Sequence, residues 1–378
     1  MALHEADQAP RTEGEPVDVD PLVEAIEYCY AQGWTDGLPV VPPTPALVDR
    51  FLSETDRDPD EVLVHIPQFR RSATVRQVAV NAAMAGCRPD YVAVVLAAFE
   101  AVVDEGWPAA GGWQSTTGGG PMLIVNGPAR HELGFNSRGN VFGPGFRANA
   151  TVGRAMRLII MNVFGIRPHE LDQSTQGTTG KYSLCIAENE EESPWAPLHV
   201  ELGDAPSDSA LSAVHVRSVD FIDNRHTADP RQILNDIGDS IARTGTIVRL
   251  HKRICVVLGP EHAQLLAGRG MSKQDVKEYL TECSFRRRDD LRRAGKDAEA
   301  SLSAHADPSP GLTPGMAEPS GEVEGAEGGD ERISVLESPD DVLVVVAGAP
   351  NAGVSAVAQP LGFPPHFPGH AVVRPHKC

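Results

Sequence analysis

Three apolar runs, each followed by a glycine turn, constrain the fold of this chain more than any other feature. The first two lie in Pro121 to Gly134 and Ile254 to Gly268, and both continue through Gly-Pro into a short helix-like segment. A looser third copy spans Val342 to Val357. Apolar runs without alternation are typical of strands covered on both faces. We therefore expect an α/β protein with a mostly parallel sheet, or sheets, flanked by helices. The likeness of the first two runs suggests two α/β halves related by duplication, and chance similarity is the alternative.

Changes in composition divide the chain into five parts. Residues 296–331 are rich in Pro, Gly, Ser, Ala and Glu, so they bury too little apolar surface to offset their chain entropy. We expect this segment to be a disordered, acidic linker, long enough for the last unit to return to the same sheet. The expected parts are a flexible leader (1–18), a first α/β half with the candidate site (19–205), a second half (206–295), this linker (296–331), and a C-terminal β-unit with its tail (332–378).

Local signals predict two consecutive helices early in the chain. Thr74 and Gln77 form a capping-box pattern, which opens a helix that should end at Gly86. Pro89 suits the first turn of the next helix, whose aliphatic run extends from Val92 to Val103. This second helix is apolar on most faces, so we expect it to be buried.

The net charge and the apolar content of the chain limit the kinds of partner that we expect it to bind. The formal net charge is −19, which repels phosphodiester backbones and anionic membranes, so we expect neither nucleic acid nor membrane as a partner. No apolar run approaches the roughly 20 residues needed to cross a bilayer, and the acidic N-terminus lacks a signal-peptide pattern. The six cysteines are scattered without a CxxC pair, which favours the cytoplasm. Homo-oligomer formation stays open, and the sequence identifies no cofactor.

Two glycine-containing loops are candidates for binding a substrate. Gln114 to Pro121 offers three glycines and the hydroxyls of Ser115, Thr116 and Thr117, and this composition suits an anion cradle or a plain flexible loop. The second loop leads into a helix that should start near Ala148, where unsatisfied N–H groups favour anions. The candidate ligand-facing residues around it are Asn126, Asn136, Arg147, Asn149 and Thr151. The alternative is that these amides and hydroxyls cap turns.

The stretch from Asp172 to Glu201 is the richest in reactive groups. Lys181 precedes a short strand containing Cys185, and a run of acidic residues and His199 follow. Lys181 could lower the pKa of a thiol, while Glu188, Glu190 and His199 could move protons. The alternatives are a core cysteine, a solvated acidic edge and a structural histidine in a strand.

Other groups offer a second thiol and a metal site. Cys87 lies between two expected helices, where the dipole of the second could activate it. Glu188, Glu190 and His199 could hold a divalent cation, although no fixed spacing such as HExxH supports this. The tail from His366 to Cys378 carries three histidines and a cysteine, and a chance His-bearing tail is the better interpretation.

Several segments together resemble a large bacterial family, the UGSC (seleno)proteins. The resemblance rests on GWTDGLPVVPPT, MAGCRPDY, MLIVNGP, NVFGPGFRANATVGRAMRL, GKYSLCIAENEEESPW with PLHVE, and LGPEHA. It spans most of the chain from Gly33 onward and implies thiol- or selenol-linked chemistry with a small Cys- or Sec-containing partner protein. This chain lacks a Cys-Gly-Ser-Cys element and its C-terminal stretch is atypical, so it does not itself carry that motif's chemistry.

These observations lead to one leading hypothesis and two alternatives. The leading one is an enzyme that acts on a small polar or anionic molecule by thiol-assisted acid/base chemistry, with lyase, hydrolase and redox types open. It requires the loop that ends at Arg147 and the loop that ends at Lys181 to meet at one cavity. The alternatives are an accessory subunit of a small Cys/Sec redox partner and a metal-dependent hydrolase or lyase.

Overall fold

A mixed sheet of seven strands is the central element of the fold. The structure is a computed structural model, and it describes residues 20–106, 112–244, 253–294, 296, 330–360 and 365–374. Six strands follow the order β4-β3-β5-β10-β6-β9, and β11 pairs with β5 beside that path. The strands are β3 (Gly120–Asn126), β4 (Cys185–Ala187), β5 (Ala210–Asp223), β6 (Ile254–Leu258), β9 (Val342–Val346), β10 (Val354–Pro360) and β11 (Gly369–Val372).

The sheet is mixed rather than mostly parallel, which corrects the expectation from sequence. Only β3 with β4 and β6 with β9 pair in parallel, whereas β5 is antiparallel to β3, β10 and β11, and β10 is antiparallel to β6. A parallel return needs a crossover of a dozen or more residues. The connection 347–353 is shorter than that and contains no helix, so the chain reverses direction between β9 and β10. The third apolar copy is therefore a strand–turn–strand unit.

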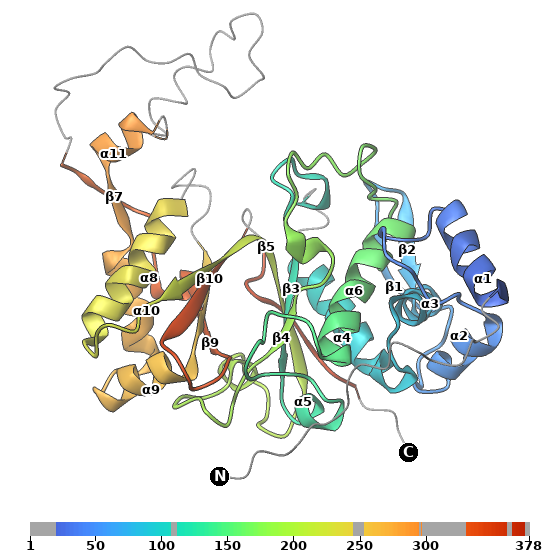
Figure 1. Cartoon of the computed structure of the whole chain (residues 1–378), viewed down its shortest axis with the longest axis horizontal. Coiled ribbons are helices and arrows are strands. Elements are labelled where there is room, and N and C mark those ends of the chain that lie inside the picture. The colour runs from blue at the N-terminus through green and yellow to red at the C-terminus, as the bar shows by residue number, and fades with distance from the viewer. Residues whose placement is uncertain are drawn as a thin grey trace, which may run out of the picture.

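The two ends of the sheet repeat one arrangement. In each, a first strand (β3 or β6) has a parallel partner on its outer side (β4 or β9) and an antiparallel partner on its inner side (β5 or β10). The sheet also curls, because Asn189, just after β4, donates its backbone N–H to the Val346 carbonyl at the end of β9 (2.7 Å; Figure 1). The carboxyl ends of both parallel pairs therefore lie close together.

Helices cover the outer face of the curled sheet in two groups (Figure 1). One core packs α3, α4 and α6 against β3, β4 and the first part of β5, and a second packs α8, α9 and α10 against β6 and β9. A third core fills the inside of the curl with residues such as Met122, Val214 and Val345. The helices are α1 (Asp20–Ala31), α2 (Pro45–Leu52), α3 (Val75–Ala85), α4 (Val92–Asp104), α5 (Ala129–Glu132), α6 (Arg147–Asn162), α7 (Leu198–Glu201), α8 (Pro230–Thr244), α9 (Pro260–Gly268), α10 (Lys273–Cys283) and α11 (Arg288–Arg293).

The local signals for α3 and α4 are confirmed at atomic detail. The Thr74 hydroxyl accepts from the Gln77 N–H and the Gln77 side chain accepts from the Thr74 N–H, so both bonds of the capping box form. The helix ends at Gly86, whose φ of 88° is costly for residues with a side chain. Pro89 begins a short 3₁₀ turn that leads into α4, whose faces are largely buried. His199 lies in the short helix α7 and not in a strand.

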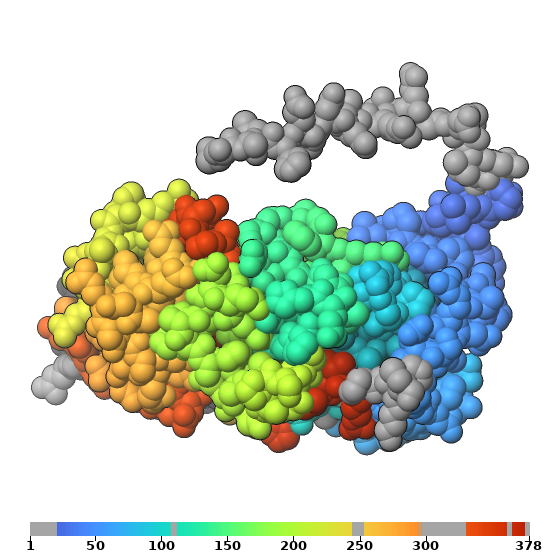
Figure 2. Space-filling model, turned by 90° about the horizontal axis from the view of Figure 1, so that it is seen from below, coloured from blue at the N-terminus to red at the C-terminus, as the bar shows by residue number. Residues whose placement is uncertain are grey.

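The two expected halves and the C-terminal unit all contribute strands to one sheet. The long strand β5 pairs with β3 over residues 210–216 and with β10 over residues 216–223, so it links the two halves. The C-terminal unit returns as β9, β10 and β11, and in the space-filling view some of its residues lie between the two halves while the last ones lie against the first half (Figure 2). Two further antiparallel strand pairs lie outside this sheet. They are β1 (Val62–Ile66) with β2 (Arg71–Thr74), and β7 (Phe285–Arg287) with β8 (Arg332–Ser334).

The expected leader (1–18) and most of the expected linker (297–329) lie outside the described residues. Among the helices that are described, none combines the length and the apolar character needed to span a membrane.

Candidate functional site

A cavity of about 780 Å³ lies between α6 and the segment 168–182. Its lining is part polar and part apolar, and the groups that matter most for the chemistry argued below are Arg157, Asp172, Ser174 and Lys181. Threonine hydroxyls of the same segment and the half-exposed Tyr182 complete the wall. A concave space of this size with a few convergent polar groups is what a small-molecule site requires.

One buried carboxylate organises the charged groups of the cavity. Lys181 Nζ donates to both oxygens of Asp172, at 2.9 and 2.7 Å, and to Ser174 Oγ at 2.6 Å. The Ser174 hydroxyl donates to Asp172 Oδ1, and the Arg157 guanidinium donates to Asp172 Oδ2 at 3.2 Å. The Asp172 side chain is only 3% exposed. Asp172 therefore fixes the positions of two cations and one hydroxyl.

The pKa values of these groups reflect burial and pairing. Burial alone would raise the pKa of Asp172, but hydrogen bonds from Lys181 and Ser174 outweigh it and lower this pKa to about 2. Burial lowers the pKa of Lys181 and of Arg157, and Asp172 opposes both shifts. At neutral pH the carboxylate is ionised and faces two cations, so one positive charge is left uncompensated.

A second ion pair at the cavity wall is balanced. The Asp36 carboxylate accepts from the Arg154 guanidinium at 2.7 and 2.8 Å, and its side chain is 2% exposed. Asp36 is therefore paired with Arg154, although its charge also favours the ionised form of Arg157 and opposes the lowering of that group's pKa by burial. Among the described residues, Asp172 is the single hydrogen-bond partner of the Arg157 guanidinium, which has further donors to offer a ligand.

The loop from Gln114 to Pro121 supports this cavity from outside. Thr175 donates its N–H to the Thr116 carbonyl at 2.9 Å, and Thr178 donates to the Gly118 carbonyl at 2.8 Å. Gly118 has a φ of 75°, and a Cβ there would lie 2.6 Å from the backbone of Gly177, so the contact requires glycine. Ser115 and Thr117 hydrogen-bond to each other. These hydroxyl residues shape the wall without lining the cavity.

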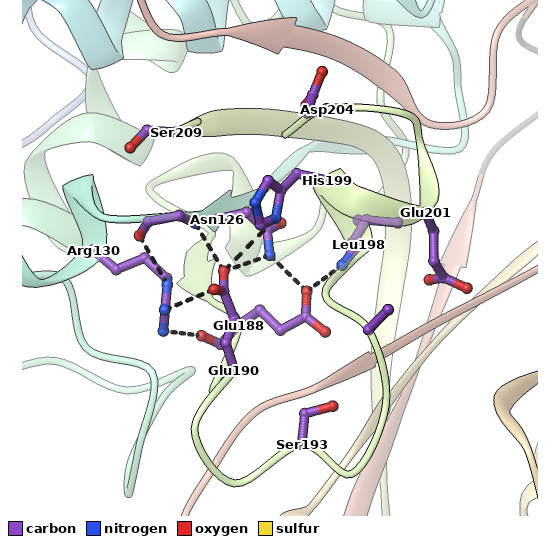
Figure 3. Close-up of polar contacts among 12 residues, drawn as sticks. Asn126, Arg130, Glu188, Glu190, Ser193, Leu198, His199, Glu201, Asp204 and Ser209 are labelled. Carbon is purple, nitrogen blue, oxygen red and sulfur yellow. Dashed lines mark hydrogen bonds and ion pairs between the residues drawn. The ribbon is translucent and has the colours of Figure 1, made fainter. Parts of the chain in front are cut away.

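A separate buried polar centre lies at the carboxyl ends of β3 and β4 (Figure 3). Asn126 Nδ2 donates to Glu188 Oε2 at 2.6 Å and to Glu190 Oε1 at 3.0 Å. Glu190 also accepts from the Gly127 N–H at 2.8 Å and pairs with Arg130 at 2.9 Å. Glu188, Asn126 and Arg130 are all buried, and burial raises the pKa of Glu188. The centre ties the ends of the two parallel strands together.

Several atoms of this centre have no hydrogen-bond partner among the described residues. They include Glu188 Oε1 and both ring nitrogens of His199, which is 1% exposed. His199 Nδ1 lies 3.9 Å from Glu190 Oε1, beyond hydrogen-bond distance. A carboxyl group with a raised pKa and an imidazole without a hydrogen-bond partner, both in one buried centre, have the composition of an acid–base pair.

The structure separates the residues that the sequence grouped into one reactive stretch. Lys181 packs beside Gly120 at the start of β3, where an added Cβ would lie 3.3 Å from Lys181 Cγ. Glu190 instead bonds to Gly127, beyond the other end of β3. Lys181 therefore belongs to the cavity, and Glu188, Glu190 and His199 belong to the polar centre.

Both candidate thiols are buried in the first core. Cys87 and Cys185 are each 5% exposed, and burial raises the pKa of Cys87 to about 12 and the pKa of Cys185 further. Neither cysteine lines the cavity, and Lys181 is bound to Asp172 instead of a sulfur atom. The thiols of both residues are protonated at neutral pH, so their environment does not support thiolate chemistry.

The asparagine-rich loop and the start of α6 are held by their own hydrogen bonds. The Arg147 guanidinium donates to the carbonyls of Gly86 and Cys87, and therefore caps the end of α3. Asn149 bonds to the backbone of Asn136 and to the Cys185 carbonyl. Asn136 donates to the Gly139 carbonyl and the Thr151 hydroxyl to the Arg147 carbonyl. Arg147 does not line the cavity, so the expected meeting with Lys181 does not occur.

The groups considered for metal binding are not gathered into one set of ligands among the described residues. Within the described ranges, no three or more His, Cys, Asp or Glu side chains are placed to hold a metal ion. In the tail, His366 bonds to Asp104 and His370 to Asp204 and Ser212. Cys378 lies outside the described residues.

No protein-family model, curated protein or solved structure matches this chain. The resemblance to the UGSC family therefore stays a prediction.

Sequence reasoning missed Arg157, Asp172 and Ser174. Arg157 carries a charge inside the largely apolar run that ends α6, and this is the signal that could have identified it. Asp172 and Ser174 precede Lys181 by nine and seven residues, and only the folded loop shows that all three side chains meet.

Proposed function

We propose that this protein is an enzyme that acts on a small organic anion, a carboxylate or phosphate compound, bound in the cavity over Arg157 and Lys181. The observation that carries the proposal is the uncompensated positive charge at the floor of the cavity. Two cations, Arg157 and Lys181, share the single carboxylate of Asp172. A ligand carboxylate or phosphate would supply the missing negative charge.

The roles of the residues follow from their geometry. Arg157 has donors left over, and a guanidinium binds carboxylates and phosphates with two parallel hydrogen bonds. Lys181 is held by Asp172 and Ser174, so its ammonium group is preorganised to stabilise negative charge that develops on the substrate. The buried thiols have no part in this proposal.

Calorimetric titration with inorganic phosphate tests the proposal without a known substrate. We expect binding by the full chain, weakened about 10- to 100-fold in Arg157→Gln, since a hydrogen bond to a charged group contributes about 1.5–3 kcal/mol. Arg243→Gln is the matched control, because Arg243 forms an exposed ion pair with Asp220 away from the cavity. Cys185→Ser should leave binding unchanged. Failure of phosphate and of simple carboxylates to bind would refute the proposal.

A second candidate function is acid–base catalysis at the polar centre, and the unpartnered atoms of Glu188 and His199 favour it. Glu188→Gln keeps the shape of the side chain and removes its ability to transfer a proton. A metabolite screen in which this variant binds a ligand and cannot convert it would support the candidate. A variant that turns over every ligand as the natural chain does would exclude it.

We also propose that the two halves arose by duplication. The support is their common strand arrangement and the Gly-Pro turns that follow β3 and β6 at equivalent positions. In the first half this turn contributes to the polar centre through Gly127.

A further inference from the structure

Besides holding Lys181, Ser174 presents a hydroxyl group to the cavity. Its hydroxyl oxygen lies 2.6 Å from Lys181 Nζ, and Lys181 Nζ lies 2.7 and 2.9 Å from the oxygens of Asp172. Ser174 is half-buried and lines the cavity, so a ligand can reach it. The Ser174 hydroxyl accepts from Lys181 and donates to Asp172 Oδ1, so the candidate nucleophile, the candidate base and the carboxylate are all in contact with one another.

These three groups are the kinds that nucleophilic catalysis uses. A serine hydroxyl is a weak nucleophile until an adjacent base takes its proton, and the base acts best when another group fixes its position. Lysine can serve as this base once it has lost its own proton, and the anionic group of the ligand is then held by Arg157 and no longer by both cations. Asp172 then stabilises the ammonium form that appears as the proton arrives.

We propose that Ser174 is a nucleophile, activated by Lys181, that attacks a small ester carrying an anionic group. This inference rests on the proposed function, because Arg157 is the group that would hold the anion. Arg157 and Ser174 both bond to Asp172, so an ester group close to the anionic end of a ligand would lie near Ser174.

The reaction balances with water as the only co-reactant. Once Lys181 has lost its proton it no longer donates to Ser174, and the Ser174 hydroxyl turns from Asp172 to the amine. The neutral amine then takes the proton from Ser174 as Oγ bonds to the acyl carbon. The bond from this carbon to the leaving oxygen then breaks, and the proton passes from Lys181 to that oxygen, which releases an alcohol. Water attacks the acyl-serine next, Lys181 again accepts a proton, and the carboxylic acid leaves as Ser174 is re-protonated.

Burial of Lys181 supports this role, because it lowers the pKa of the ammonium group while Asp172 opposes the shift. The neutral amine becomes more abundant as pH rises. Nucleophilic reactivity of Ser174 should therefore increase with pH until Lys181 is fully deprotonated.

Labelling with a fluorophosphonate, followed by mass spectrometry of peptides, tests the inference directly. We expect one stoichiometric adduct on Ser174, formed faster at pH 9 than at pH 6, and none in Ser174→Ala. Lys181→Arg keeps the positive charge and the ability to pair with Asp172, yet an arginine does not deprotonate in proteins. It should lower the labelling rate at least 100-fold and change phosphate binding by only a few fold. Ser193→Ala is the control, because the Ser193 hydroxyl donates to the Trp195 carbonyl and accepts from the Trp195 N–H, and no hydrogen bond among the described residues joins it to a lysine.

The possible outcomes separate this inference from the proposed function. Phosphate binding without an adduct on Ser174 would overturn the nucleophile and leave the anion site intact. An adduct on Ser174 that forms equally fast in Lys181→Arg would overturn the role of Lys181 as the base. Absence of both binding and labelling would overturn the two proposals together.

Discussion

Lys181 and Cys185 lie four residues apart in the sequence, yet they meet different environments. Lys181 lines the cavity and bonds to Asp172, whereas Cys185 faces the core beneath α6. A cation near a thiol in sequence lowers the pKa of that thiol only if the two side chains meet in space. Here they do not, and burial raises the pKa of the thiol instead.

A single buried carboxyl group outside the site, Glu105, makes the stability of the fold depend on pH. Burial raises the pKa of Glu105 to about 8, although the His215 backbone N–H donates to it at 2.7 Å. Between about pH 4.5 and 8 the unfolded chain releases this proton while the folded chain keeps it, so the group lowers the free energy of unfolding as pH rises. Glu105→Gln keeps the acceptor and removes the titration.

We therefore expect Glu105→Gln to gain stability relative to the natural chain between pH 5 and pH 8, by up to about 4 kcal/mol. Urea unfolding of both proteins at several pH values measures this difference. A difference that stays constant with pH would show that Glu105 ionises equally in both states.

At the scale of elements, α6 positions the cavity because it packs closely against the chain that leads from Lys181 into β4. Gly153 makes this contact: a Cβ there would lie 2.4 Å from Ser183 Oγ and 3.0 Å from the Leu184 nitrogen. Arg157 lies one turn further along the same helix. The spacing between α6 and β4 therefore sets where Arg157 stands relative to Lys181.

Gly153→Ala should destabilise the fold by about 1–3 kcal/mol, since overpacking outweighs the roughly 1 kcal/mol that alanine gains in helix propensity. Gly268→Ala is the control: it lies at the end of α9 with open space around its Cβ position, so it should be neutral or stabilising. Chemical denaturation of both variants measures the effect. Equal stabilities would contradict the close packing of α6 on β4.

Local elements could be predicted from the sequence because their signals are local. The capping box at Thr74 and the apolar runs of β3 and β6 are examples. Strand direction could not be predicted, because an apolar run looks the same in a parallel and an antiparallel sheet. The site could be predicted only in part for the same reason: Lys181 stands out by composition, whereas its partners Asp172 and Arg157 are chosen by the folding of the loop and of α6.

At the scale of the whole molecule, β5 joins two helix-covered halves into one sheet. Its first part pairs with β3 and its last part with β10, so neither half has a complete sheet without it. Shared strand pairing of this kind favours cooperative unfolding.

Two tryptophans report on the two halves separately. Trp113 lies in the core under α3, α4 and α6, and Trp195 packs against the core of the second half. Two variants each keep one of these tryptophans and have the others replaced by phenylalanine. In each variant, the urea midpoint measured by tryptophan fluorescence should equal the midpoint measured by circular dichroism. Fluorescence midpoints that separate from the circular dichroism midpoints would show that the halves unfold independently.

The most direct test of the anion site is to locate a heavy oxyanion in crystals of the full chain. Tungstate resembles phosphate in shape and charge. The strong anomalous scattering of tungsten shows where it binds, because the light atoms of the protein give almost no such signal. We predict a peak in the cavity within hydrogen-bond distance of the Arg157 guanidinium, lost in Arg157→Gln. Tungstate bound only elsewhere, or a peak unchanged in that variant, would contradict the claim that Arg157 and Lys181 form the substrate site.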